Sequence, residues 1–199
     1  MTSWGIENDK PNIKTPKDDG DIPSFTHELL HLYMDHLGMT SKRFIFENIM
    51  SVTVLLFLNR FMFDHLYNIS SHKKMYPYFR GMGFKDVDFV KKTNSFFTQF
   101  DFTIIKICKR LNIFSKLYVS QFIGHTLSLM NDVVEVRRDQ DRRFLYKLSR
   151  LDRELYKVIY LFDSKWSRQE DLNCQDNFYE LSNGILKYLF RHDKIKKDK

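Results

Sequence analysis

The stretch FLYKLSRLDRELYKVIYLF, residues 144–162, indicates the fold class of the chain. Its apolar residues recur every three or four positions, while Arg, Lys, Asp and Glu occupy most positions between them. This period matches the 3.6 residues per turn of an α-helix and predicts an amphipathic helix with one buried face. The residues expected to face the core are Phe144, Leu148, Leu151, Leu155, Ile159 and Phe162.

The same period recurs on both sides of this stretch, which predicts a mainly α-helical protein with little or no sheet. The further apolar stripes are Phe97, Phe100, Ile104, Ile107, Cys108 and Leu111, and then Phe178, Leu181, Ile185 and Leu189. Residues 115–134 predict another helix, and the apolar run 49–58 predicts a buried one. Residues 76–86, YPYFRGMGFKD, hold one Pro and two Gly and are expected to form a connecting loop.

Length and composition favour one hydrophobic core, because the chain has 199 residues of which 43% are hydrophobic. The prediction is a single helical domain over residues 23–190, with the HELLH helix packed against further amphipathic helices. A metal-site part would cover residues 23–75 and a helical bundle part residues 93–190. Residues 1–22 are polar and are expected to be a flexible lead-in, and residues 191–199 a basic tail.

The charge and cysteine content limit the partners and the compartment. A net charge of +7 permits contact with nucleic acid or with an anionic membrane, without requiring either. Cys108 and Cys174 are too few for a disulfide scaffold and fit a reducing compartment. The first residues lack the apolar stretch of a secretory signal, and the run 49–58 is shorter than the roughly 20 residues that span a bilayer. The sequence therefore predicts a cytoplasmic protein without a membrane span.

A His-Glu-x-x-His motif, HELLH, lies in THELLHLYMDH, residues 26–36. Pro23 suits the first turn of a helix and Gly38 suits its left-handed end, so a helix is expected over about residues 24–37. On such a helix His27 and His31 are about 40° apart around the axis and one turn apart along it, so both imidazoles can reach one metal ion. Glu28 lies beside them, where a carboxylate can take a proton from metal-activated water.

These five residues resemble the motif of the zincin group of zinc metallopeptidases. The resemblance implies that His27 and His31 bind Zn²⁺, that Glu28 is the catalytic glutamate, and that the substrate is a peptide or protein. Zincins usually place a twisted sheet before the catalytic helix, and an edge strand of that sheet binds the substrate. Here only the polar residues 1–22 precede the motif, so that edge strand is not expected.

A catalytic zinc usually takes three protein ligands, so a third residue is expected near the motif. Five of the seven histidines lie between His27 and His72. In FDHLYNISSHKKM, residues 63–75, one helical face would carry Asp64, His65, Asn68 and His72. The end of this stretch, NISSHKKM, resembles a segment of uncharacterised bacterial HELLH proteins, which favours His72 as the third ligand ahead of His65 and Asp64.

Other residues near the motif are weaker candidates for the third ligand. Glu47 would come back opposite His31 if the next helix ran antiparallel to the HELLH helix. His36 follows at an interval that differs from the metzincin pattern and falls on the far side of the helix, so it is expected at the surface. Asp64 or Asn68 would accept a hydrogen bond from the imidazole N–H that faces away from the metal. The alternative is that these polar residues form only a solvated helix face.

The sequence therefore predicts a zinc-dependent hydrolase, metallopeptidase-like, in which His27, His31 and His72 hold Zn²⁺ and Glu28 acts on the water. The alternative is a non-enzymatic helical binding or regulatory module with a structural or vestigial metal site. RRDQDRR, residues 137–143, offers basic charge for nucleic acid or protein, but its interleaved Asp residues are typical of a salt-bridged helix face. Nucleic-acid binding is thus the less favoured hypothesis.

Overall fold

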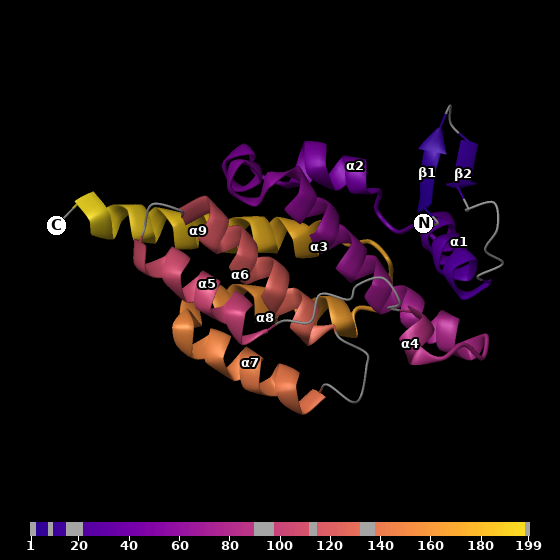
Figure 1. Ribbon diagram of the computed structural model, residues 1–199. Helices are drawn as coiled ribbons and strands as arrows, with labels where there is room; N and C mark the ends of the chain where they lie inside the picture. The colour runs from indigo at the N-terminus through magenta and orange to yellow at the C-terminus, as the bar shows by residue number, and fades with distance from the viewer. Residues whose placement is uncertain are drawn as a thin grey trace.

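The structure is a computed structural model that describes residues 3–7, 10–14, 22–89, 98–111, 115–131 and 138–197, and it confirms a mainly α-helical fold. Figure 1 shows the helices packed side by side, with the first strands and helices at one end and the C-terminal end of α9 at the other. In chain order the elements are β1 (Ser3–Glu7), β2 (Lys10–Lys14), α1 (Ile22–His36), α2 (Lys42–Phe44), the π-helix η1 (Ile45–Ile49), α3 (Val52–Gly81), α4 (Asp86–Phe89), α5 (Gln99–Leu111), α6 (Ser115–Met130), α7 (Arg138–Leu151), α8 (Arg153–Arg168) and α9 (Gln175–Lys197).

The long helix α3 connects the two ends of the molecule. Its 30 residues correspond to a length of about 45 Å. Helices α6 and α9 pack against it, and so do α1 and α4, which lie near its C-terminal end (Figure 1). Buried hydrophobic residues from Leu30 in α1 to Leu189 in α9 belong to one core. Helix α3 therefore joins the HELLH region to the helical bundle.

The stretch that predicted one helix, residues 144–162, forms two. Helix α7 ends at Leu151 and α8 begins at Arg153, so the prediction of a continuous helix is wrong. Asp152 separates them because it has extended backbone dihedrals, φ −147° and ψ 90°, and its side chain accepts a hydrogen bond from the backbone N–H of Leu155 at 3.1 Å. This is the geometry of a helix N-cap. The expected core positions are nevertheless buried, apart from the partly buried Leu151.

The Asp152 carboxylate also joins four helices. It accepts hydrogen bonds from the hydroxyls of Tyr118 at 2.8 Å and Tyr188 at 2.7 Å, and from Lys109 Nζ at 3.1 Å. Burial alone would raise the pKa of Asp152, but the hydrogen bonds from Tyr188, Leu155 and Tyr118 and the charge of Lys109 outweigh burial and lower it. The carboxylate is therefore held as an anion between α5, α6, α8 and α9.

The apolar stripe predicted around α5 faces solvent. Phe100, Ile104, Ile107 and Leu111 are exposed by 71%, 37%, 47% and 49%. Within α5 the side chains that are buried belong to Ile105 and Cys108, and Phe97 lies outside the described residues. The prediction that these four residues form the core face is therefore wrong. Cys108, which the prediction placed in the same stripe, is buried on the other apolar face, through which α5 packs on α6 and α7. The stripe of α9, by contrast, is buried as predicted.

The segment 76–86 was predicted to be a loop, but α3 continues through Pro77 to Gly81. A proline inside a helix costs about 3 kcal/mol because it removes a backbone hydrogen bond. Burial offsets this cost here, since Phe79 is fully buried and its ring lies 4.8 Å from that of Phe84. The helix ends where Gly83 adopts φ +87°, a conformation that suits glycine.

Both ends of the chain contain more regular structure than the sequence suggested. Within residues 1–22, expected to be a flexible lead-in, β1 and β2 form an antiparallel pair in which Trp4 lies opposite Ile13. This hairpin packs on α1. The alternation of Trp4 and Ile6 with Ser3, Gly5 and Glu7 is short, which is why the period gave no strand signal. At the other end, residues 191–197 of the predicted basic tail are helical, because α9 continues to Lys197. In the described part of the chain, none of the helices is long and apolar enough to cross a membrane.

Candidate metal centre

Helix α1 presents the HELLH residues to α3. Leu30 and Met34 are buried, which fixes the rotation of α1 against the core, and His31 is turned inward beside them with 5% exposure. The helix ends as the sequence predicted, because Gly38 adopts φ +92° and the N–H of Met39 returns to the carbonyl of Met34 at 3.0 Å. His27 and His31 therefore point toward the same neighbouring helix.

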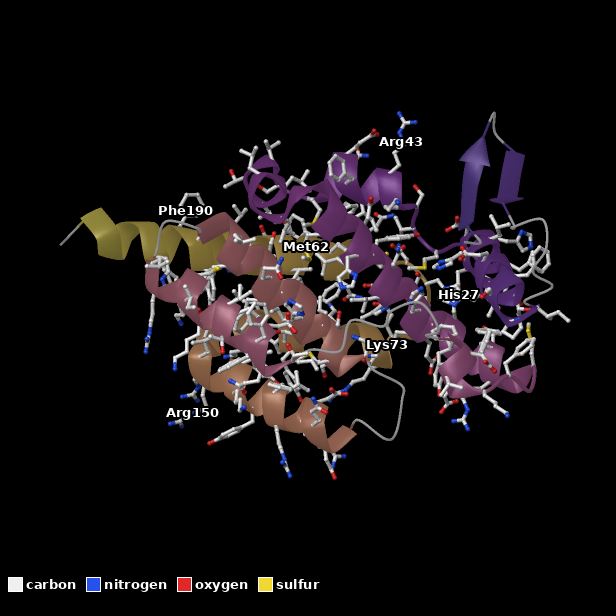
Figure 2. All side chains as sticks on the ribbon, in the orientation of Figure 1. His27, Arg43, Met62, Lys73, Arg150 and Phe190 are labelled. Atoms are coloured by element: carbon white, nitrogen blue, oxygen red, sulfur yellow. The ribbon has the colours of Figure 1, made fainter. Side chains whose placement is uncertain are left out.

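Helix α3 brings His72 to the same place. The ligand nitrogens of His27, His31 and His72 all lie within 4.8 Å of one another. Nε2 of His27 is 3.1 Å from Nε2 of His72, close to the roughly 3.3 Å between two nitrogens that bind one tetrahedral zinc at 2.0–2.1 Å. Figure 2 shows His27 lying between α1 and α3. The three histidines predicted as ligands are thus brought together, and together they could hold a metal ion.

Ser71 orients the imidazole of His31. The Ser71 hydroxyl donates its proton to the carbonyl of Asn68 at 2.8 Å, and its oxygen lies 3.3 Å from Nδ1 of His31. Because the single hydroxyl proton is already used, the contact with His31 is one in which Nδ1–H donates to Ser71 Oγ. The lone pair of His31 is then on Nε2. This arrangement fixes the tautomer in the way that supporting hydrogen bonds do around bound metals.

His31 and His72 are neutral at neutral pH. Burial lowers the pKa of His31 to about 3, with the nearby His27 and Lys42 acting in the same direction. Burial also lowers the pKa of His72 well below its ordinary value, and the neighbouring imidazoles add to the effect. A neutral imidazole has the free lone pair that a metal requires. The donor set therefore fits a divalent ion such as Zn²⁺, which accepts three histidine ligands.

An aromatic wall closes one side of the cluster. The ring of Phe89, in the short helix α4, lies 4.8 Å from the ring of His27 and 5.4 Å from that of His72. Phe89 in turn packs on Phe79 at 5.0 Å and on Tyr76 at 5.4 Å. The wall excludes water from that side. Glu28 and His27 are half-buried, whereas His31 is buried.

The other candidate ligands lie elsewhere. Glu47 is in η1, half exposed, and pairs with Arg43 at 3.0 Å. Asp64 pairs with Lys42 at 3.2 Å. Nε2 of His65 is 2.9 Å from Ser128 Oγ on α6. His36, the last residue of α1, is exposed as the sequence predicted. The described residues thus single out His72 from the alternatives that the sequence left open.

Sequence reasoning missed the two residues that support the cluster. It expected Asp64 or Asn68 behind an imidazole, whereas the structure places Ser71 there, inside α3 and 1% exposed. The signal for Ser71 was its spacing of one residue from His72, which by itself has no specificity. Phe89 could not be found, because its contact with His27 depends on how the chain turns after Gly83.

Comparison of the chain with models of protein families, with curated proteins and with solved structures returns no match. The functional argument therefore rests on the geometry and chemistry of the histidine cluster.

Proposed function

We propose that the chain is a metal-dependent hydrolase of the metallopeptidase type, with Zn²⁺ held by His27, His31 and His72. The observation that carries the proposal is the convergence of three imidazoles on one point, two of them from a HELLH helix. Convergence at this spacing and in neutral form is what a zinc site requires. The two unbonded cysteines, Cys108 and Cys174, fit the cytoplasmic location predicted from the sequence.

Bound zinc would supply a Lewis acid that lowers the pKa of a water molecule to about 7. The chain would supply the rest of the chemistry. Glu28 is half-buried and follows His27 in α1, so its carboxylate could accept the proton as water attacks a peptide carbonyl. The same carboxyl group can then protonate the leaving amine. Ser71 keeps His31 in the tautomer that presents Nε2.

The experiment that tests the site is elemental analysis of purified, untagged protein. About one zinc per chain is expected in the wild type, and its loss is expected in each of His27→Ala, His31→Ala and His72→Ala. His36→Ala and His65→Ala are matched controls that should keep the metal, because these two histidines lie outside the cluster. Protein that binds no zinc after reconstitution would refute the proposal.

The catalytic role has its own test. Glu28→Gln should keep the zinc and lose hydrolysis of a fluorogenic peptide library, because a neutral amide cannot accept the proton. Glu47→Gln is the matched control, since Glu47 is a glutamate of η1 that pairs with the surface residue Arg43. Hydrolysis that persists in pure Glu28→Gln protein would refute the mechanism while leaving the metal site intact.

One observation favours a second function, a structural metal site in a non-enzymatic helical module. His31 is buried and Phe89 covers one side of the cluster, as in sites whose metal joins two helices. Under that hypothesis, removal of zinc would lower the melting temperature strongly, and Glu28→Gln would change neither metal content nor any activity. The Glu28→Gln assay therefore separates the two functions.

A further inference from the structure

The exposed face of α5 carries an apolar stripe at helical spacing. Phe100, Ile104, Ile107 and Leu111 fall within an arc of about 60° and are 37% to 71% exposed. The same helix already buries Ile105 against the core. The stripe is therefore a second apolar face, and contiguous exposed apolar residues of this kind mark sites of interaction.

The side of α5 next to the stripe is basic. Helix α7 lies along this side, as shown by Lys147, whose Nζ is 2.8 Å from Gln99 Oε1 and 5.6 Å from the ring centre of Phe102. By helical geometry, Lys106 and Arg110 fall on the same side of α5, between the stripe and α7. Both are exposed.

Helix α7 adds basic side chains to this side of the stripe. Arg143, Lys147 and Arg150 follow one another at steps of four and three residues, so they share one face of α7, and all three are exposed. Figure 2 shows Arg150 extending outward from α7, away from the body of the molecule. In the described residues of α5 and α7 the one exposed acid is Asp139, which lies in the first turn of α7, four residues before Arg143 and 3.9 Å from Arg142.

We infer that the α5 stripe and the bases beside it form a surface that docks on an anionic phospholipid membrane. Helices that lie in a membrane interface combine an apolar face, which enters the acyl boundary, with bases that contact acidic headgroups. Like charges gathered on one flank repel each other, and an anionic surface relieves this repulsion. The inference is independent of the metal centre.

Charge and side-chain chemistry favour this partner over two others. If a second copy packed its α5 on the stripe, the basic flanks of both copies would meet without an acidic counterpart. The phosphates of a nucleic acid would neutralise the Lys and Arg side chains. Single strands, however, also bind by stacking their nucleobases on aromatic rings, and the stripe is mainly aliphatic at Ile104, Ile107 and Leu111. A lipid surface satisfies both parts of the pattern.

The test is vesicle flotation of the full chain. The wild type should float with vesicles of phosphatidylcholine and phosphatidylserine, should not float with phosphatidylcholine alone, and should be released by salt. Phe100→Ser with Ile107→Ser, and separately Lys106→Glu with Arg110→Glu, should each weaken binding about tenfold or more. Lys157→Glu and Leu161→Ser, two exposed positions on α8, are controls expected to bind like the wild type.

Four outcomes would overturn the inference. The wild type could bind neither the phosphatidylserine-containing vesicles nor those of phosphatidylcholine alone, or it could bind both equally. It could form a dimer in solution that Phe100→Ser with Ile107→Ser converts to a monomer, which would make the stripe a self-association surface. It could shift single-stranded RNA in a gel in a way that charge reversal abolishes and the serine substitutions leave unchanged, which would assign the bases to nucleic acid.

Discussion

Replacement of Asp152 by alanine should destabilise the whole helical bundle. The substitution removes the acceptor for two buried hydroxyls, those of Tyr118 and Tyr188, which are 5% and 4% exposed. Each buried donor left without a partner costs about 1–3 kcal/mol, and loss of the N-cap of α8 costs about 1 kcal/mol. Lys109 is one-third exposed and can turn to water, so its loss adds little.

These contributions belong to one network and are not additive, so the expected loss for Asp152→Ala is about 3–5 kcal/mol of unfolding free energy. In a chain of this size that corresponds to a melting temperature lower by roughly 10 °C. Urea unfolding followed by circular dichroism measures the loss directly. Asp152→Asn is the matched variant and should lose less, because its amide oxygen can still cap α8. A loss below about 1 kcal/mol in Asp152→Ala would refute the network argument.

The pH dependence gives an independent check with a definite sign. The pKa of Asp152 is lower in the folded chain than in the unfolded chain, so its charge stabilises the fold above the unfolded value of about 3.9. This stabilisation is lost as the pH falls through that value toward the folded-state pKa. The difference in stability between wild type and Asp152→Asn should thus be constant near neutral pH and shrink below about pH 4. A difference that stays constant into acid would show that the charge is not its source.

Three further predictions follow from single contacts. Gly184→Ala should lower the free energy of unfolding by about 1–2 kcal/mol, because a Cβ there would lie 2.7 Å from Val158 Cγ1 and β-branched valine has little freedom to move. Gly81→Ala is the control: a Cβ there meets open space, so the substitution should be neutral or slightly stabilising. Equal melting temperatures of the two variants would contradict this prediction. Ser71→Ala should weaken zinc binding about 10- to 100-fold in a chelator competition, and unchanged affinity would show that Ser71 does not orient the imidazole. Burial raises the pKa of Cys174 to about 11, so at pH 8 iodoacetamide should label it only after unfolding, and rapid labelling of the native chain would exclude the buried position.

The comparison of sequence and structure at α5 shows where local pattern stops being informative. Period 3.6 correctly predicts that Ile104 and Ile107 share a helical face, because this depends only on the geometry of one helix. Which of two apolar faces is buried depends on the neighbours, and here Ile105 and Cys108 face the core. The same holds at Asp152, because the tyrosines that hydrogen-bond its carboxylate, Tyr118 and Tyr188, come from helices distant in the sequence.

At the candidate metal site, too, some features follow from the sequence and others from the tertiary structure. The sequence alone determined the HELLH helix, its end at Gly38 and the pairing of His27 with His31, since all of these follow from local spacing and backbone preference. Helical spacing did not separate His65 from His72, because they are seven residues apart and share one face of α3 about 10 Å apart along its axis. The preference for His72 came from the resemblance of NISSHKKM. The tertiary structure decided, because α1 meets α3 at the level of His72, whereas His65 faces Ser128 on α6.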